Sequence, residues 1–349
     1  MTLARSAGAL LAAAALFLAA CGDDSDSTAT AGSGSGSSTT AAAKAPDKLI
    51  IGYQAIPNGD LVVKHEGWLE QALPDTKIEW KQFDSGGSVN EAIAADSLDI
   101  GLAGSSPVSR GLSQPLEYQV PWIHDVIGKA EALAARKGIT SIAQLKGKKI
   151  ATPLASTSHY SLLAALKDAG LEQKDVKIID AEPPDIAAAW ERGDIDAAYV
   201  WNPVLAQLKK DGATVLVDSE QLAKKGKTTY DLAVVANSFA EEHPDTVKTW
   251  VAQQDKAVKL IKSSPDEAAA AVAAELNLKP EEAKAQMGDL IFLDASEQAA
   301  PDALGGGLGK ALFDAATFNK ELGQIPKTQD EGSYADAVKP EFAQQVAPG

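Results

Sequence analysis

Residues 148–170 read KKIATPLASTSHYSLLAALKDAG, and this stretch decides the fold class. The first seven residues have the apolar character of a short buried strand, and the end of the stretch has the apolar spacing of an amphipathic helix. Between the two lie four consecutive hydrogen-bonding residues, Ser156, Thr157, Ser158 and His159, where a single N-cap would be sufficient. A strand followed directly by a helix predicts an α/β unit.

The same alternation continues on both sides of this stretch. Strands are expected at 48–54, 77–83, 98–104, 148–154, 176–181 and 194–200, with helical patterns between them, among them 59–73. This order predicts α/β architecture with mainly parallel strands. Residues 92–107 and 188–203 resemble each other, which favours two similar lobes. Beyond about residue 236 the pattern is helical, with helices expected at 238–261, 264–276 and 304–322.

The N-terminal residues 1–20 predict an export signal. One basic residue, Arg5, precedes an apolar stretch that is too short for an ordinary membrane-spanning helix. The sequence LAAC at 18–21 resembles the lipobox of bacterial lipoproteins, in which the cysteine is lipidated and becomes the mature N-terminus. We therefore expect a lipoprotein signal peptide and a lipid on Cys21, with a plain secretory signal as the alternative.

Residues 21–47 are rich in Gly, Ser, Thr and Ala, a composition typical of a flexible tether. Folded structure is expected from about Lys48. The lipid would hold the protein in the cell envelope, at the outer face of the cytoplasmic membrane, and it would be the protein's only contact with that membrane.

The composition argues against several classes of function. A formal charge of −16 disfavours nucleic acid and anionic lipid as partners, because both require a basic patch. One cysteine and four scattered histidines predict no metal site, and no cofactor is expected. The serine-rich turns lack the Gly-x-Ser-x-Gly pattern of a nucleophile elbow, and His159 does not face the hydroxyls that precede it on a helix. We therefore expect a binding protein without catalytic residues.

Three strand-to-helix turns favour an anion site. The start of a helix offers unpaired N–H groups and the positive end of the macrodipole, so it binds an anion without any lysine. In open α/β sheets the carboxyl ends of the strands are also where ligands bind. As an alternative, one hydroxyl caps each helix and the others are surface residues. The three turns are rich in Ser and contain Ser85, then Ser105 with Ser106, then residues 156–158.

Two acidic residues favour a cation site. Glu131 and Asp231 each enter an apolar strand, where an unpaired carboxylate is costly. Trp201, at the end of another strand, is either a lining residue or a core residue. A cation site beside an anion site predicts a small zwitterionic ligand.

The segments STSHYSLLAALK (156–167) and AAWERGDIDAAYVW (188–201) resemble the periplasmic taurine-binding proteins of ABC transporters, within the wider sulfonate and nitrate binding group. The similarity covers most of residues 48–260. It implies a type II periplasmic-binding-protein fold, with two α/β lobes joined by a two-strand hinge and the ligand in the interlobe cleft. Lobe 1 would contain 48–131 plus 232–349, and lobe 2 would contain 132–231.

The resemblance also implies contacts and partners. The amine of the ligand would meet Glu131 and Asp231, and Gln54 and Trp201 would line the cleft. The partners would be a membrane permease and an ATPase, and the protein would act as a monomer. The sulfonate would meet Ser105, Ser106, Ser156, Thr157 and Ser158, and we count Ser85 and His159 among the ligand-binding residues.

Two positions depart from the family pattern and leave the ligand open. Lys129 lies just before the first acidic residue, and Ala233 replaces a bulky aromatic residue that taurine binders often carry. The alternative ligand is a simple alkanesulfonate or another small organic anion. A second alternative is an enzyme on the same fold, similar to a pyrimidine-synthesising relative, and a third is a receptor that presents its ligand to a membrane sensor.

Overall fold

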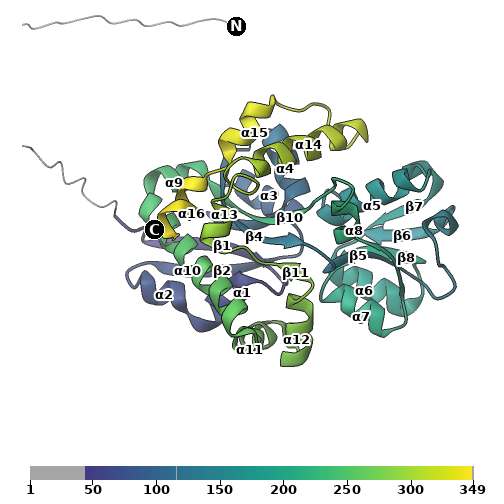
Figure 1. The fold of residues 1–349 in the computed structure, drawn as a ribbon, viewed down its shortest axis with the longest axis horizontal. Helices are drawn as coiled ribbons and strands as arrows, with labels where there is room; N and C mark the ends of the chain where they lie inside the picture. Colours follow the sequence, from purple (N-terminus) through teal and green to yellow (C-terminus); the bar gives the residue numbers. More distant parts are fainter. Residues whose placement is uncertain (1–43, 115, 348–349) are drawn as a thin grey trace, which may run out of the picture. The chain divides into compact units, whose positions relative to one another are not determined.

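The computed structural model describes residues 44–114 and 116–347, and its strands form two separate sheets (Figure 1). The expected signal peptide, the lipidation site at Cys21 and the tether up to residue 43 lie outside the described residues. The first sheet has the order β11-β4-β10-β3-β1-β2, and the second has the order β7-β6-β8-β5-β9. The expected α/β architecture with two sheets is confirmed.

The strands of the first sheet are β1 (Lys48–Gln54), β2 (Lys77–Phe83), β3 (Ile100–Gly104), β4 (Tyr118–Ile127), β10 (Tyr230–Ala236) and β11 (Leu290–Ile291). Those of the second sheet are β5 (Glu131–Ala135), β6 (Lys149–Thr152), β7 (Lys177–Asp180), β8 (Ala197–Trp201) and β9 (Thr214–Asp218).

The two sheets repeat one arrangement. In the first, β1 pairs in parallel with β2 and β3, and in the second, β6 pairs in parallel with β7 and β8. The similar passages 92–107 and 188–203 therefore contain β3 and β8, which occupy corresponding places. The expectation of mainly parallel strands is wrong outside these triplets, because β10, β4 and β11 pair antiparallel in the first sheet and β5 and β9 do so in the second.

The chain passes twice between the sheets. It leaves the first sheet at the end of β4 and enters the second at β5 after residues 128–130. It returns from β9 through the short helix α8 (Ser219–Ala223) and residues 224–229 to β10. The first passage ends at β5, whose first residue is Glu131, and the second ends at β10, which carries Asp231. Both acidic residues therefore lie at the junction of the two sheets.

Helices cover both faces of each sheet (Figure 1). In the second sheet α5 and α8 pack on one face, where Leu162, Leu166 and Leu222 are buried. On the opposite face α6 and α7 bury Trp190 and Leu205. The other helices pack on the first sheet or lie in the C-terminal part of the chain. The bounds of all helices except α8, which is given above, follow. The helices are α1 (Gly59–Glu66), α2 (Trp68–Ala72), α3 (Gly86–Ala94), α4 (Ser105–Ser113), α5 (Thr157–Asp168), α6 (Pro183–Arg192), α7 (Val204–Lys210), α9 (Asn237–Glu242), α10 (Pro244–Ser263), α11 (Pro265–Leu276), α12 (Pro280–Met287), α13 (Ala295–Gln298), α14 (Gly307–Glu321), α15 (Glu331–Ala337) and α16 (Pro340–Val346).

Two expected helices are each divided in two. The helix expected at 59–73 ends at Gly67, whose φ of 61° is left-handed, and restarts as α2. The helix expected at 238–261 is interrupted at His243, because Pro244 begins a new helix at its first position.

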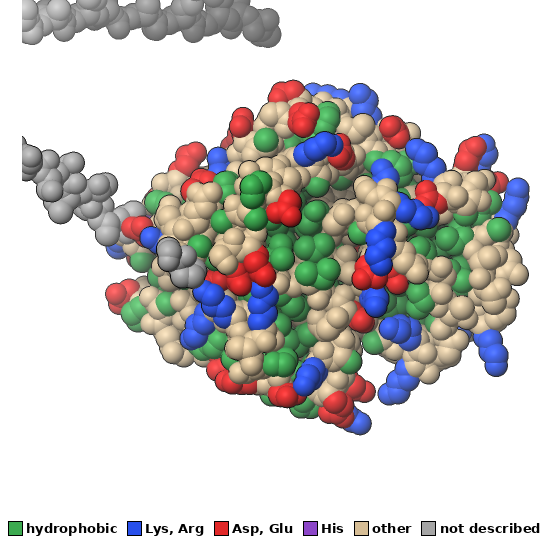
Figure 2. Space-filling model, in the orientation of Figure 1, with side chains coloured by type: hydrophobic (Ala, Val, Ile, Leu, Met, Phe, Trp, Pro, Cys, Tyr) green, Lys and Arg blue, Asp and Glu red, His purple; other side chains and the backbone are tan. Residues whose placement is uncertain are grey.

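On the face shown in Figure 2, acidic and basic side chains are interspersed, and the basic ones do not gather into one patch. In the described part of the chain, no helix is both long and apolar enough to cross a membrane.

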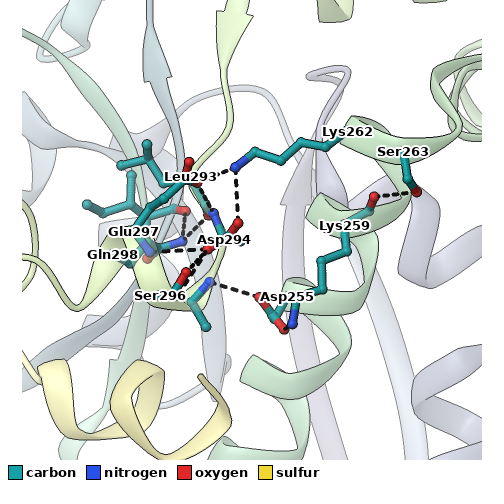
Figure 3. Close-up of polar contacts among 11 residues, drawn as sticks. Asp255, Lys259, Lys262, Ser263, Leu293, Asp294, Ser296, Glu297 and Gln298 are labelled. Atoms are coloured by element: carbon teal, nitrogen blue, oxygen red, sulfur yellow. Dashed lines mark hydrogen bonds and ion pairs between the residues drawn. The ribbon is translucent and has the colours of Figure 1, made fainter. Parts of the chain in front are cut away.

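At the outer edge of β4, β11 pairs only with Val126 and Ile127, and at Ile123 a side chain takes the place of a neighbouring strand. Gln298, at the end of α13, accepts from the Ile123 N–H at 2.8 Å and donates to the Ile123 carbonyl at 2.9 Å. The helix is fixed in turn, because Asp255 of α10 accepts from the Ala295 N–H at 2.8 Å and Lys262 of α10 pairs with Asp294 and Glu297 (Figure 3).

Replacement of Gln298 by Ala should lower the free energy of unfolding by about 2–3 kcal/mol, because two buried backbone groups of Ile123 would lose their partner. Urea denaturation measures this change. The matched control is Gln71→Ala, which removes a single exposed bond to the Glu66 carbonyl and should cost less than about 0.5 kcal/mol. If both variants lost the same free energy of unfolding, the hydrogen bonds of Gln298 to Ile123 would contribute no more to stability than one exposed hydrogen bond.

Candidate functional site

A small cavity lies where the two sheets meet. It contains about 420 Å³ of space between atoms, part of which is open to solvent. Six of the eleven residues expected at the site line it, namely Gln54, Glu131, Ser156, Thr157, Trp201 and Asp231. The other lining residues are Ile56, Pro57, Gly86, Gly104, Pro107, Ile127, Ala130, Asn202 and Leu290.

Three helix starts converge on this cavity. Gly86 begins α3, Gly104 directly precedes α4, and Thr157 begins α5. Each follows the carboxyl end of a strand, β2, β3 or β6, as the sequence predicts. The first turns of the three helices therefore bring unpaired N–H groups and the positive ends of three dipoles to the cavity.

The hydroxyl groups at these turns are mostly engaged within the protein. Ser156 caps α5 by accepting from the His159 N–H at 3.1 Å, and it donates to the Pro153 carbonyl at 2.7 Å. Ser105 accepts from the Tyr230 N–H at 3.2 Å. Thr157 also lines the cavity, and its hydroxyl donates to the carboxylate of Glu131, one of the two acidic residues of the expected cation site.

Five expected site residues are not among those that line the cavity. Ser85 donates to Glu182 at 2.9 Å, which joins the start of α3 to the start of α6. The Ser158 hydroxyl and the His159 Nε2 are buried without a hydrogen-bond partner among the described residues. Burial lowers the pKa of His159 to about 4, so its ring is uncharged at neutral pH. Ser105 and Ser106 complete the set, and the Ser106 hydroxyl accepts from Asn319 Nδ2 at 3.4 Å.

Glu131 is the first residue of β5 and is fully enclosed, with 1% of its surface exposed. Its carboxylate accepts from the Thr157 hydroxyl at 2.6 Å and from the Ser219 hydroxyl at 3.2 Å. Burial raises the pKa of Glu131 to about 8, the charge of Asp231 adds to this rise, and the bonds from Thr157 and Ser219 oppose it. Trp201 lies directly opposite Glu131 in the antiparallel ladder.

Asp231, near the start of β10, is the second acidic residue of the cavity. Burial raises its pKa to about 7, and the neighbouring Asp125 lowers it in part. The departures noted in the sequence do not line the cavity: Lys129 is exposed, and Ala233 is buried within β10. Among the described residues that line the cavity there is no lysine or arginine to neutralise either carboxylate.

Sequence reasoning missed Asp125 and Asn202. Asp125 lies on β4 opposite Asp231, is completely buried, and has no hydrogen-bond partner for either oxygen among the described residues. Burial, and then the charge of Asp231, raise its pKa well above the usual range. An aspartate inside the apolar run VPWIHDVI was the available signal. Asn202 lines the cavity, and its buried Oδ1 has no partner in the described chain.

This arrangement suits a small ligand with an anionic and a cationic end. The helix starts offer neutral donors to an anion, and the two carboxyls offer acceptors to a cation. In the described residues no group of His, Cys, Asp and Glu is arranged to hold a metal ion.

Comparisons with known proteins give a consistent result. The sequence matches the family described as NMT1/THI5 like over residues 59–268. The taurine-binding periplasmic protein of Escherichia coli (strain K12) is 38% identical over 273 residues, which are 76% of this chain and 84% of that protein. The putative aliphatic sulfonates-binding protein of the same strain is 31% identical over 241 residues, 68% of this chain and 74% of that protein.

A solved structure has the same fold. The alkanesulfonate-binding protein SsuA from Xanthomonas axonopodis pv. citri, bound to MOPS, superposes with a TM-score of 0.73 at 25% identity. The superposition covers 85% of this chain and 99% of that one. All three of these relatives are named as binding proteins.

The raised pKa of Glu131 predicts a particular pH dependence of stability. Between its usual value of 4.5 and its folded value of about 8, the folded protein binds more protons than the unfolded protein. The free energy of unfolding therefore falls as the pH rises through this window. Glu131→Gln should reduce the fall between pH 5.5 and pH 8 by about 1–3 kcal/mol, measured by urea denaturation at both pH values.

The control for this prediction is Glu91→Gln, at an exposed position of α3. It should keep the pH dependence of the wild-type protein. An unchanged pH dependence in Glu131→Gln as well would mean that this carboxyl does not titrate in the expected window.

Proposed function

We infer that this chain, which belongs to the NMT1/THI5-like family, is the solute-binding protein of an ABC importer and carries taurine or a close aminosulfonate. The observation that carries the proposal is a cavity lined by two carboxyl groups and by the starts of three helices, with no basic residue among its described lining residues. The names of the relatives, taurine-binding and aliphatic sulfonates-binding, support the same ligand class.

In this proposal the sulfonate lies against the starts of α3, α4 and α5. A sulfonate stays ionised at ordinary pH and has three oxygens, so several neutral donors can hold it together. Backbone N–H groups near Gly86, Gly104 and Thr157 are the donors at the cavity, because the Thr157 hydroxyl donates to Glu131. The ligand is bound and released unchanged.

The ammonium group lies against Glu131 and Asp231. Its charge offsets the cost of burying these carboxylates, so ligand binding favours their ionised forms. The face of Trp201, opposite Glu131, adds a site for a cation. A simple alkanesulfonate lacks this cation, which is why we place taurine ahead of it.

The cellular arrangement belongs to the same proposal. Export, lipidation at Cys21 and a tether would hold the protein at the outer face of the cytoplasmic membrane, where as a monomer it delivers its ligand to a permease driven by an ATPase. The lobes would be the regions around the two sheets, with a hinge at residues 128–130 and 224–229. This places the hinge just before the predicted boundaries at 131/132 and 231/232.

Calorimetric titration tests the ligand. The unlipidated chain from residue 21, with Cys21→Ser, should bind taurine at micromolar affinity or tighter, about 8 kcal/mol, and ethanesulfonate much more weakly. Asp231→Asn should weaken taurine binding by about tenfold or more, because a charged partner is lost, and should change ethanesulfonate binding far less.

Two results would contradict this assignment in different ways. If Asp231→Asn weakened the binding of taurine and of ethanesulfonate equally, Asp231 would not contact the ammonium group. Ethanesulfonate binding without taurine binding would leave the anion site in place and exclude the zwitterion.

Closure of the cavity is tested at Gly104. A Cβ at this position would approach the Thr157 Cγ2 to 2.5 Å, so Gly104→Ala should push the start of α5 away from β3. We expect taurine affinity to fall by about tenfold with little change in thermal stability, because the contact joins elements of the two sheets rather than one core.

Two further variants make this test specific. Gly87→Ala is the matched control, because its Cβ would meet nothing nearer than Ser85 Oγ at 3.6 Å. Addition of Thr157→Ser to Gly104→Ala removes the clashing methyl group and keeps the hydroxyl, so it should recover most of the affinity. Failure of this recovery would mean that Gly104 acts in another way.

A further inference from the structure

Two buried carboxyl groups face each other beside the cavity. Asp125 on β4 and Asp231 on β10 are direct partners in the antiparallel ladder, so both side chains project from the same face of the sheet. Asp125 is completely enclosed, whereas Asp231 is 6% exposed and lines the cavity. Like charges directly opposite each other destabilise a sheet, so this pair requires an explanation.

A β-bulge brings Asp125 to this position. The ladder pairs Asp231 with Asp125 and Leu232 with Ile123, so His124 has no partner on β10. Gln298 holds Ile123 through both of its backbone groups from the outer edge of β4. The location of Asp125 is therefore enforced by the strand itself and by α13.

His124 is directed to a different set of residues. Its Nε2 lies 3.6 Å from Asp60 Oδ2, and its ring meets the ring of Trp250 edge-on. Burial lowers the pKa of His124 to about 3 and raises that of Asp60 to about 7. With both groups desolvated and no hydrogen bond between them, the contact is one between an uncharged imidazole and a carboxyl group rather than an ion pair.

No positive charge neutralises the Asp125–Asp231 pair in the described structure. The groups that face Asp125 are Asp231 from β10, Glu131 from the start of β5 and Asn58 from the turn before α1. On its own strand, His124 is uncharged. Two carboxyls this close, in a site without a cation, cannot both be ionised, and they hold one proton between them.

The proton belongs on Asp125. Asp231 reaches the cavity, where water or a ligand can solvate its charge, but Asp125 has no water-facing surface, and its oxygens accept no hydrogen bond from an N–H or O–H group of the described chain. A protonated carboxyl is also a donor, and Asp231 is an acceptor directly opposite.

We propose that Asp125 is a positioning residue of the ammonium site: it stays protonated and donates its O–H to Asp231, which it holds ionised for the cation of the ligand. This inference rests on the proposed function, since the cation is the ammonium group of an aminosulfonate. It adds to that function the source of the charge that the cation meets, because the strand pair then carries a single negative charge, on Asp231, beside Glu131.

The same substitution at the two facing positions tests the proposal. Asp231→Asn removes the charge, and taurine affinity should fall by about tenfold or more. Asp125→Ala removes the donor, and affinity at pH 6 should also fall by about tenfold, with a smaller deficit at pH 8, where Asp231 ionises without help. Asp125→Asn restores a donor of the same size and should recover most of the loss seen with alanine. All titrations use the unlipidated chain from residue 21.

Two results of the titrations would overturn the proposal. If Asp125→Asn loses as much affinity as Asp231→Asn, Asp125 carries charge rather than a proton. If Asp125→Ala binds taurine as the wild-type protein does at both pH values, the residue does not act on the site. Should the alanine variant not fold, the comparison of the two asparagine variants still decides.

An infrared measurement keeps this test separate from the ligand assignment. The spectrum of the ligand-free wild-type protein minus that of Asp125→Asn at pH 7 should contain the C=O band of a protonated carboxylic acid. Absence of the band would overturn the proposal even if taurine binds. Failure of the wild-type protein to bind taurine would refute the proposed ligand, and the band would still show whether Asp125 holds the proton.

Discussion

The cost of burying carboxyl groups at the junction of the two sheets governs the rest of the structure. Asp125, Glu131 and Asp231 lie in or directly behind one cavity, and none of the described lining residues is basic. Each of these groups has a raised pKa because its charged form is poorly solvated. In our proposal the ligand supplies the missing positive charge, so that charge neutralisation and ligand binding are the same event.

The acids cannot escape this cost by moving to the solvent, because they lie on central strands. β10 pairs with β3 on one side and with β4 on the other, and β5 lies between β8 and β9. A strand with neighbours on both sides has its backbone groups fixed by two ladders. The strands next to the crossings thus keep Glu131 and Asp231 facing the cavity, and the bulge on β4 does the same for Asp125.

The sequence was informative where a residue contradicted its surroundings. Glu131 and Asp231 were identified because a carboxylate in an apolar strand is costly, and the same argument applied to Asp125. It was missed because the strand 118–127 was not recognised, since its run includes both a histidine and an aspartate. The alternation of strands and helices predicted the α/β architecture, but the antiparallel pairing depends on where the chain crosses, which periodicity does not encode.

Side-chain direction at the helix starts was less predictable. The serines were expected to face a ligand, yet Ser105 bonds the backbone of Tyr230, which is 125 residues away in the chain. Such a contact depends on the tertiary arrangement and leaves no local pattern. By contrast, Ser156 is an ordinary N-cap, the reading that local rules already offered as the alternative.

Because these hydroxyl groups form hydrogen bonds within the protein, other donors must hold an anion. With Gly86 and Gly104 at the cavity, the donors left for an anion are largely backbone N–H groups, which are neutral and present at any helix start. Such donors orient a sulfonate but distinguish poorly between one sulfonate and another. Discrimination then falls to the acidic side, where a ligand without a cation leaves Glu131 and Asp231 either protonated or unpaired. In our proposal the specificity of this protein therefore lies in the strands next to the two crossings between its sheets, and its helix starts only orient the ligand.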